Sequence, residues 1–323
     1  MGQFLIRRRF WAVFLFFAAT IVTYLIFYVI PAYPAALAAG KAATQADVAR
    51  VRHFLHLDEP IWLQYLHFLW NIIGHQSLGR SFVNRQSVNF IIGQDAPVTA
   101  SLVFGGAVFW LTLSIPVGVL SALRPRSLMD RASMTFVLIG ISAHPVWIGL
   151  ILSYVFGYKL GLTPIANYCD FFPGTAGAQC TGPVQWAYHL ILPWVTFMVL
   201  FAALYVRLVR ASVMETLSED YVRTARAKGA SERRVMVQHV LRNSMLPVVT
   251  ILGMDIGLAL GGAIFTESIF NLPGLGRELI SANNNDDLPL ITGIVVFATL
   301  AVIIFNLLVD VAYAFLDPRI RPS

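Results

Sequence analysis

Six long apolar runs limit what this chain can fold into. Each is about twenty residues long with few charges, and a helix of that length crosses the roughly 30 Å of hydrocarbon in a bilayer. A segment inside lipid must satisfy its own backbone hydrogen bonds, which an α-helix does. The runs cover residues 10–30, 98–123, 134–157, 188–206, 245–265 and 290–315. The sequence therefore predicts an all-α polytopic membrane protein with six transmembrane helices.

The basic residues predict the orientation of these helices. If the N-terminus is cytoplasmic, the inner segments 1–9, 124–133, 207–244 and 316–323 hold 16 of the 23 Lys and Arg residues. This asymmetry follows the positive-inside rule, so we expect both termini in the cytoplasm. The same topology accounts for the net charge of +6, and no nucleic-acid partner is expected.

Four segments follow from this topology. Residues 1–30 form an N-terminal anchor and first transmembrane helix, because the apolar run of 21 residues exceeds that of a removable signal peptide. Residues 31–97 form an extracytoplasmic helical cap. Residues 98–315 form a five-helix core that includes the cytoplasmic loop 207–244, and residues 316–323 form a cytoplasmic tail.

A short apolar stretch of the cap, "IWLQYLHFLWNII", is predicted to be a helix that begins at Pro60. Its thirteen residues cannot cross a bilayer. Trp62, Tyr65 and Trp70 suit a position at the interface between membrane and water. We therefore expect this helix to lie on the outer face of the membrane.

The two cysteines, Cys169 and Cys180, both lie in the outer loop 158–187. On the oxidising side of a membrane this pair could form a disulfide, and two free thiols are the alternative. Their spacing does not match a metal or redox motif. His53 and His56 lack suitably spaced carboxylates or cysteines, so we expect no metal site and no cofactor.

The stretch "EDYVRTARAKGASERR" is highly polar in a chain that is 57% apolar. Ser218 before it is a predicted helix N-cap, and Glu219 can pair with Arg223 four residues later. Gly229 supplies a left-handed residue that ends this helix, and Ser231 can cap a second one. The stretch therefore predicts two short helices joined by a turn.

The cations of the first short helix suggest a use for it. Arg223, Arg226 and Lys228 would be exposed, with the small residues Ala225 and Ala227 between them. Such a surface could dock into a groove of a soluble protein. A solvated charged loop is the alternative, although such loops need no caps at both helices.

The sequence from this helix onward, "DYVRTARAKGASERRVMVQHVLRNSMLPVV", resembles the cytoplasmic signature loop of permease subunits of binding-protein-dependent ABC importers, in the oligopeptide, dipeptide and nickel branch. The stretches "RRRFWAVFLFFAATIVTYLIF", "LGRSFVNRQSV", "ESIFNLPGLGRELI" and "AYAFLDPRIR" also resemble this branch, so the likeness covers essentially the whole chain. Two stretches depart from it: "YPAALAAG" after the first span, and the insert that holds both cysteines.

The resemblance implies a type I ABC importer permease-like fold in a bacterial-type cell membrane. It implies that the loop carries a coupling helix, which sits in a cleft of a cytoplasmic ATPase. The residues carried over to this role are Arg223, Thr224, Ala225, Arg226, Ala227, Lys228 and Gly229. The implied partners are a second similar permease subunit, two ATPase subunits or domains, and an extracytoplasmic substrate-binding protein that delivers a peptide.

This chain is not expected to hydrolyse ATP itself. None of its three lysines is followed by Ser or Thr, so it has no GxxxxGK[ST] loop to hold phosphates. We therefore expect a subunit that is not an enzyme, driven by ATP hydrolysis in a partner.

Polar and small residues inside the spans are candidates for a translocation path. Asp255 lies in the fifth span, where a carboxylate is costly unless it faces protein or water. It could contact a substrate amine or form a hydrogen bond between helices. His144, before Pro145, could line a path or simply pack. Small residues at four-residue spacing could serve intramolecular packing, a subunit interface or the path; they are Gly253, Gly257 and Gly261.

Other functions remain open at this level. An ion-coupled secondary transporter acting alone would need a chain of intramembrane ionisable groups and inverted repeats, and few such groups are present. An intramembrane hydrolase would need a metal motif or a nucleophile–base pair, and neither is evident. Within the resembled branch, nickel or another small solute could replace peptides. The outer-loop acids Glu278, Asp286 and Asp287 could meet a substrate-delivery protein or the peptide N-terminus, or they could be solvated.

Overall fold

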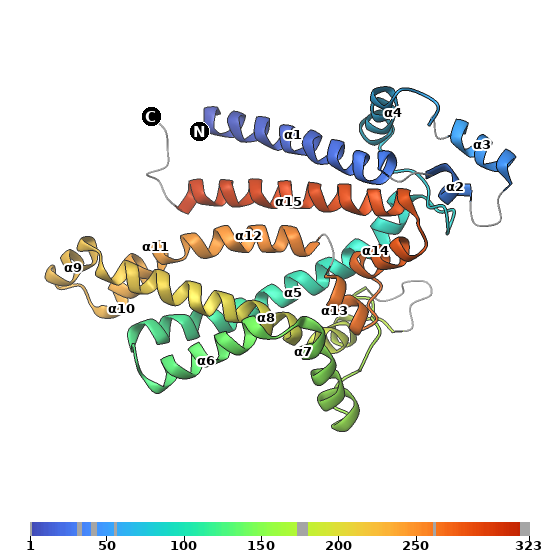
Figure 1. The fold of residues 1–323 in the computed structure, drawn as a ribbon. Coiled ribbons are helices and arrows are strands. Elements are labelled where there is room, and N and C mark those ends of the chain that lie inside the picture. The colour runs from blue at the N-terminus through green and yellow to red at the C-terminus, as the bar shows by residue number, and fades with distance from the viewer. Residues whose placement is uncertain are drawn as a thin grey trace. The chain divides into compact units, whose positions relative to one another are not determined.

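The computed structural model describes residues 2–30, 34–39, 44–54, 57–172, 180–260 and 263–316 (Figure 1). The α-helices of this part of the chain are α1 (Gly2–Tyr24), α2 (Pro34–Ala39), α3 (Gln45–Phe54), α4 (Ile61–Ile73), α5 (Val88–Leu123), α6 (Leu128–Ser142), α7 (Pro145–Leu152), α8 (Pro183–Ser218), α9 (Asp220–Ala227), α10 (Glu232–Arg234), α11 (Arg242–Ser244), α12 (Leu246–Leu260), α13 (Ile264–Ile269), α14 (Leu275–Asn284) and α15 (Leu288–Leu316). Its π-helical segments are η1 (Leu25–Val29), η2 (Ser153–Lys159) and η3 (Val235–Leu241). The predicted all-α class is confirmed.

Four helical segments of the described chain are long and apolar enough to cross a membrane by themselves: Arg8–Val29, Val88–Leu123, Pro183–Ser218 and Leu288–Val309. Two bent pairs qualify when each pair is taken as one span. One joins α6 to α7 and η2, and the other joins Glu232–Ser244 to α12 with a bend of 43°. The described helices therefore provide four candidate spans, and they provide the six that the sequence predicts if each bent pair is one broken span.

The third predicted span, residues 134–157, differs most from expectation because it is not one helix. Ala143 and His144 are extended, with ψ of 132° and 139°. Proline disfavours helical geometry in the residue before it and cannot donate the next backbone hydrogen bond. Consequently α6 ends at Ser142, α7 begins at Pro145, and the two segments meet at 106°. Pro145 therefore marks a full break between two helices rather than a kink within one.

The chain forms two compact units, each made of segments that are separate in sequence. The first unit contains Met1–Thr99, Gly257–Ile264 and Pro273–Ile304. The second contains Ala100–Ile256, Phe265–Leu272 and Phe305–Ser323. The long helices α5 and α15 each contribute one end to each unit.

In the first unit, the beginning of α5 packs against α14 and α15. Burial of apolar side chains from these three helices stabilises the unit. Gly293 of α15 allows close approach, since a Cβ there would lie 2.4 Å from Val88 Cγ1. The backbone N–H of Leu275 donates to Thr99 Oγ1 at 2.9 Å, so α14 is also hydrogen-bonded to α5. The buried cluster comprises Val88, Ile91, Ile92, Leu275, Ala282, Leu290, Ile291 and Ile294.

The cap helix α4 is attached to the C-terminal part of α1. Tyr24 Oη donates to Gln64 Oε1 at 2.8 Å, and the hydroxyls of Thr20 and Tyr65 lie 3.0 Å apart. Helix α4 is present as the sequence predicts, but it begins at Ile61, and Pro60 is its N-cap. These hydrogen bonds fix the short helix to a membrane-spanning one.

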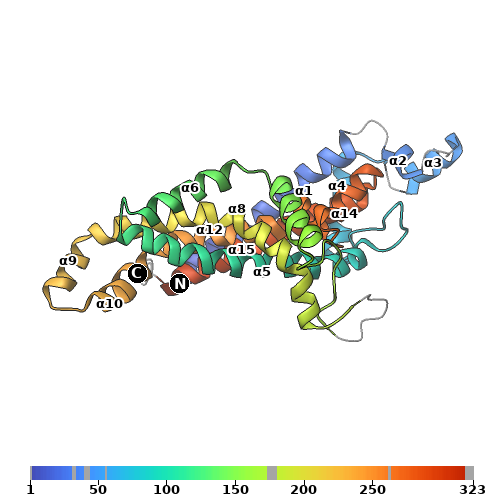
Figure 2. The same ribbon diagram turned by 90° about the horizontal axis from the view of Figure 1, so that it is seen from below.

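In the second unit, α8 lies against both α5 and α6, and Figure 2 shows α6 running beside it. Three glycines permit these contacts, because a Cβ at each would overlap a residue of α8. It would lie 2.2 Å from the Trp194 ring at Gly105, 2.7 Å from Val209 Cβ at Gly118, and 2.6 Å from Ala203 Cβ at Gly140. Close helix approach through small residues is a common way to pack helices in membranes.

Candidate functional site

A short polar helix, α9, follows α8 with only Glu219 between them (Figure 1). Glu219 is extended, with φ −68° and ψ 144°, and this single residue turns the chain. At the other end, Gly229 has φ +78°, the left-handed conformation that glycine adopts without a steric penalty. The predicted pair of helices joined at Gly229 is therefore present as α9 and α10.

One face of α9 is anchored to the rest of the second unit. Val222 is completely buried, as is Val235 at the start of η3. Tyr221 Oη accepts a hydrogen bond from Asn243 Nδ2 at 2.8 Å. A helix of eight residues is too short to be stable alone. These contacts therefore hold α9 in place.

The other face of α9 is exposed. Arg226 Nε lies 2.9 Å from Glu232 Oε1, and Arg223 Nη1 lies 3.5 Å from Asp220 Oδ1. Exposed ion pairs of this kind contribute about 1 kcal/mol or less, so they hold these side chains only weakly. Of the expected coupling residues, Ala225 is half-buried. The others are all exposed: Arg223, Thr224, Arg226, Ala227, Lys228 and Gly229.

Two details of the predicted helix start are wrong. The Ser218 hydroxyl donates to the Glu215 carbonyl at 2.7 Å, and Glu219 occupies the N-cap position. Arg223 pairs with Asp220 rather than with Glu219. Both differences have one cause: α8 continues through Ser218, so the turn lies one residue later than expected.

A buried ion pair that the sequence analysis did not single out lies between α6 and α8. Arg210 donates to both carboxylate oxygens of Asp130, from Nε at 2.6 Å and from Nη2 at 3.1 Å. The Ser121 hydroxyl and the Arg126 N–H also donate to this carboxylate. The pair therefore connects α8 to the turn between α5 and α6. A single Asp near a helix start gives no signal of a partner 80 residues away.

Asp255 of α12 accepts a hydrogen bond from Tyr205 Oη of α8 at 2.8 Å. Tyr205 is completely buried, and Asp255 is half-buried. One of the two expected roles, a hydrogen bond between helices, is thus present. The bond uses Oδ2 of the carboxylate.

His144 is exposed at the break between α6 and α7. Its Nδ1 accepts from the Val146 N–H at 3.3 Å, which makes it the N-cap of α7. Its ring lies edge-on to Phe265, with centroids 5.1 Å apart. Within the described residues, His144 and Asp255 share no hydrogen bond or ion pair, so the structure does not join them in one cluster.

The glycines of α12 have a packing role at one position. A Cβ at Gly253 would lie 1.9 Å from Val309 Cγ2, so α15 approaches α12 at this glycine. Gly257 is also buried, whereas Gly261 lies outside the described residues. The three glycines that contact α8 were missed by the sequence analysis, since none of them belongs to a glycine repeat at four-residue spacing.

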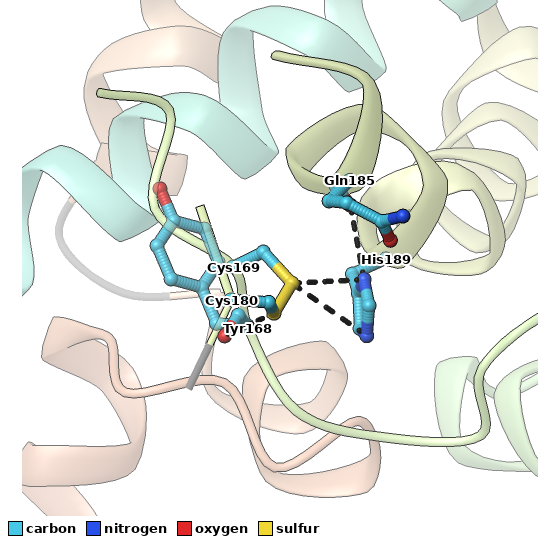
Figure 3. Close-up of a disulfide and its surroundings, with 5 residues drawn as sticks. All are labelled: Tyr168, Cys169, Cys180, Gln185 and His189. Carbon is cyan, nitrogen blue, oxygen red and sulfur yellow. Dashed lines mark hydrogen bonds between the residues drawn. A yellow bond between two sulfur atoms is a disulfide. The ribbon is translucent and has the colours of Figure 1, made fainter. Parts of the chain in front are cut away.

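Cys169 and Cys180 form a disulfide with their Cα atoms 5.0 Å apart (Figure 3). Cys169 Sγ lies 3.1 Å from His189 Nδ1, which also lies 2.9 Å from the Gln185 carbonyl. These two cysteines and His189 come close enough to share a metal ion. Sulfur ligates metals as a thiolate, however, so the disulfide excludes that use of the cluster.

The acids that we expect in an outer loop differ in their environments. Asp287 is buried and accepts from the Ser81 hydroxyl and the Phe82 N–H, so it is neither solvated nor available to a partner. Asp286 is exposed. Burial raises the pKa of Glu278 above its ordinary value, an effect that the Asp287 charge adds to and the Arg277 charge opposes.

Comparison with known proteins gives matches along the whole chain. Residues 114–322 match the family described as "Binding-protein-dependent transport system inner membrane component". Residues 1–103 match the family described as "Binding-prot-dependent transport system membrane comp, N-term". Together these regions cover almost every predicted span.

Three curated relatives are similar over 99% of this chain and at least 99% of their own. The probable peptide ABC transporter permease protein y4tP of Sinorhizobium fredii and the dipeptide transport system permease protein DppB of Escherichia coli are each 36% identical. A putative peptide transport system permease protein of Brucella abortus is 35% identical.

A solved structure of the inward-facing MetNI methionine ABC transporter has a similar fold. The TM-score is 0.52 at 16% identity, and the match covers 71% of this chain and 97% of that one. A likeness at this identity concerns the fold alone.

Proposed function

Because this chain belongs to the inner membrane components of binding-protein-dependent transport systems, we propose that it is the permease subunit of an ABC importer for dipeptides or oligopeptides. Relatives named for peptide and dipeptide transport support the substrate class. The membrane helices would form the path for the peptide. The energy would come from an ATPase on a separate chain, since this chain lacks a phosphate-binding loop.

The observation that carries this proposal is the geometry of α9. Its buried Val222 and the Tyr221–Asn243 hydrogen bond hold one face, while Arg223, Arg226 and Lys228 leave a cationic face open. A helix that is fixed on one side and exposed on the other suits docking into a groove of a partner. We assign α9 and the following turn as the ATPase-coupling element, on the cytoplasmic side.

The connection between α9 and α8 favours transmission of force. Only Glu219 separates the two helices, so a displacement of α9 is not absorbed by a flexible loop. Further along α8, Arg210 holds Asp130 at the start of α6. Closure of the ATPase would therefore shift α9, α8 and the α5–α6 turn together. Such a shift would exchange inward-open and outward-open states of the transporter.

Within the membrane, we propose Asp255 as the residue that meets the peptide. A carboxylate in a span attracts the ammonium group of a peptide N-terminus, and Tyr205 orients it from one side. His144, at the break between α6 and α7, would line the path. The break places backbone that is not helical within a span, which membrane proteins tolerate where it faces protein or a water-filled cavity.

The proposed partners are a second similar permease subunit, two ATPase subunits or domains, and an extracytoplasmic substrate-binding protein. The family description names dependence on a binding protein. The second permease subunit would complete the path that this chain begins. A lipid bilayer surrounds the assembly.

Co-purification tests the coupling role. The chain is tagged, expressed with its native partners, and isolated in detergent; the bound ATPase is measured by its ATP hydrolysis and by mass spectrometry. Reversal of charge in Arg226→Glu and Lys228→Glu should remove the ATPase. The matched control is the double variant Arg233→Glu/Arg234→Glu on α10, where both residues are also exposed and the change of charge is the same. Retention of the ATPase by the double variant would contradict the proposal.

Reconstitution separates this function from a transporter that acts alone. Liposomes that contain the purified chain without partners should not accumulate labelled peptide, whatever ion gradient is applied. Liposomes that contain the whole complex should accumulate it when ATP is present. Uphill uptake by the chain alone would exclude an ABC permease.

A further inference from the structure

A cavity of about 700 Å³ lies in the first unit, beside the attachment of α4 to α1. Tyr24 and Tyr28 of the first span and Phe68 of α4 form an aromatic wall, and the loop before α5 contributes Arg80 and Arg85. Ligand sites in proteins commonly have volumes of roughly 300–1,000 Å³, with a few polar groups on an apolar lining. This cavity has the size and the chemistry of a binding site.

The loop that carries the two arginines is held rigidly. The buried Asp287 accepts from the Ser81 hydroxyl, from the Phe82 N–H at 3.0 Å and from the Val83 N–H at 3.5 Å. The Asn89 side chain accepts from the Leu78 N–H at 2.8 Å. A buried carboxylate with several donors fixes a loop strongly, because each of its lost hydrogen bonds would be costly. The loop is therefore preorganised.

The backbone of this loop also contains residues at positive φ, a conformation that glycine adopts freely and other residues adopt only with strain. Gly79 has φ +92°, and Gln76 and Arg85 have φ of +49° and +55°. Residues other than glycine are uncommon at positive φ, and such strain persists only where surrounding contacts enforce it. The hydrogen bonds of Asp287 and Asn89 provide those contacts, which present Arg80 and Arg85 to the cavity.

The two arginines are not neutralised by the described part of the chain. Both are exposed, and neither has an ion-pair partner among the described residues. The acid Asp287 is occupied by the loop itself, and Glu59 lies 3.1 Å from His67 Nδ1. The cavity thus presents two guanidinium groups that are available to an anion, and guanidinium groups bind phosphate with favourable geometry.

Helix α4 shows where this cavity lies relative to lipid. Gln64, Phe68 and their neighbours on one face line the cavity, and α4 crosses the end of α1 (Figure 1). The opposite face is exposed and apolar, with Trp62, Leu66 and Trp70 at helical spacing and 65%, 50% and 64% exposed. Tryptophan in such a position is typical of the boundary between membrane and water. The cavity therefore opens at the level of lipid headgroups.

We propose that this cavity binds the headgroup of an anionic phospholipid. Arg80 and Arg85 would hold the phosphate, and Tyr24, Tyr28 and Phe68 would contact the glycerol and the first part of an acyl chain. This inference does not depend on the peptide-transport proposal, and it gives the first unit a role in lipid recognition.

Native mass spectrometry of the full chain, purified with its partner subunits, tests this site. The protein is equilibrated in mixed micelles with equal amounts of phosphatidylglycerol and phosphatidylcholine, and retained lipids are counted. Arg80→Gln and Arg85→Gln should each weaken phosphatidylglycerol retention about fivefold, the effect of about one basic residue at an anionic membrane surface. Arg50→Gln removes the same charge from exposed α3, outside the cavity, and should change nothing.

A variant that keeps both charges tests the cavity itself. Asn71 lines the cavity from α4, and Asn71→Phe would fill part of it, so phosphatidylglycerol retention should again fall. Unchanged retention in the Arg80→Gln/Arg85→Gln double variant would overturn the proposal. Equal retention of phosphatidylcholine would also overturn it. Displacement of the lipid by glycerol phosphate at a comparable concentration would reassign the cavity to soluble phosphates and overturn the lipid assignment.

Discussion

Arg210 of α8 and Asp130 of α6 form a partly buried two-point ion pair, with Nε–Oδ1 and Nη2–Oδ2 distances of 2.6 and 3.1 Å. The side chain of Asp130 is 7% exposed and that of Arg210 is 25% exposed. Helix α8 continues from Arg210 to Ser218 and leads directly into α9. The pair therefore ties the α5–α6 turn to the helix that we propose transmits force from the ATPase.

Removing one charge of this pair should destabilise the protein strongly. Asp130→Asn leaves Arg210 charged and partly buried, which typically costs about 3 kcal/mol or more. We expect a clear fall in the thermal unfolding midpoint of the purified protein. Asp220→Asn is the matched control, since Asp220 is 96% exposed and its pair should contribute less than about 1 kcal/mol. Equal midpoints for the two variants would show that the buried pair is not stabilising.

The left-handed backbone at Gly229 predicts that substitutions there impair coupling to different degrees. A Cβ at Gly229 would meet no atom within 4 Å, so Gly229→Ala costs only the backbone penalty of about 1 kcal/mol. Asn tolerates this conformation better, so Gly229→Asn should be milder. We expect peptide-stimulated ATP hydrolysis of the complex to fall in the order glycine, asparagine, alanine.

Gly93→Ala serves as the control for Gly229. Gly93 also has open space around its Cβ position, but it lies inside α5, where alanine is favourable. Its variant should hydrolyse ATP as the wild type does. If Gly229→Asn impaired ATP hydrolysis more than Gly229→Ala does, this interpretation of Gly229 would be wrong.

A charge swap shows whether the charge of Arg226 serves its ion pair with Glu232 or docking to the ATPase. Arg226→Glu/Glu232→Arg preserves an ion pair across the turn but places the opposite charge on α9. Since an exposed pair contributes about 1 kcal/mol or less, folding should be unaffected. We expect loss of the co-purifying ATPase with an unchanged unfolding midpoint. A swap variant that retained the ATPase would mean that the charge serves only the turn.

The polar turn and the apolar runs were predictable because their signals are local. Gly229 marks the turn by its conformational freedom, and twenty apolar residues mark a span by length. The break at His144 was only partly predictable: Pro145 indicates a kink, but the size of the bend depends on packing around it. The Asp130–Arg210 pair, and the glycines that face α8 at Gly105 and Gly140, depend on contacts between distant segments and have no local pattern.

The disulfide between Cys169 and Cys180 should stabilise its loop. The two cysteines are eleven residues apart in the sequence. A disulfide that closes a loop of this length contributes about 3 kcal/mol to the free energy of unfolding, because it restricts the unfolded chain. The double variant Cys169→Ser/Cys180→Ser should unfold at a lower temperature than the wild type. Dithiothreitol should lower the midpoint of the wild type and leave that of the double variant unchanged. An equal response of both proteins to dithiothreitol would exclude a stabilising bridge.

Asp255 could bind a peptide ammonium group or serve only the contact between helices. Peptides with free and with acetylated N-termini distinguish these two roles. Asp255→Asn removes the charge but keeps an oxygen that accepts from Tyr205 Oη, so stability should change by less than about 1 kcal/mol. If the carboxylate holds a peptide ammonium, uptake of peptides with free N-termini should fall about tenfold, which corresponds to 1.4 kcal/mol. Uptake of the N-acetylated forms should be unchanged. Tyr205→Phe controls for the helix contact, because it removes the hydrogen bond and leaves the charge. Equal losses for free and acetylated peptides in Asp255→Asn would assign this carboxylate to helix packing alone.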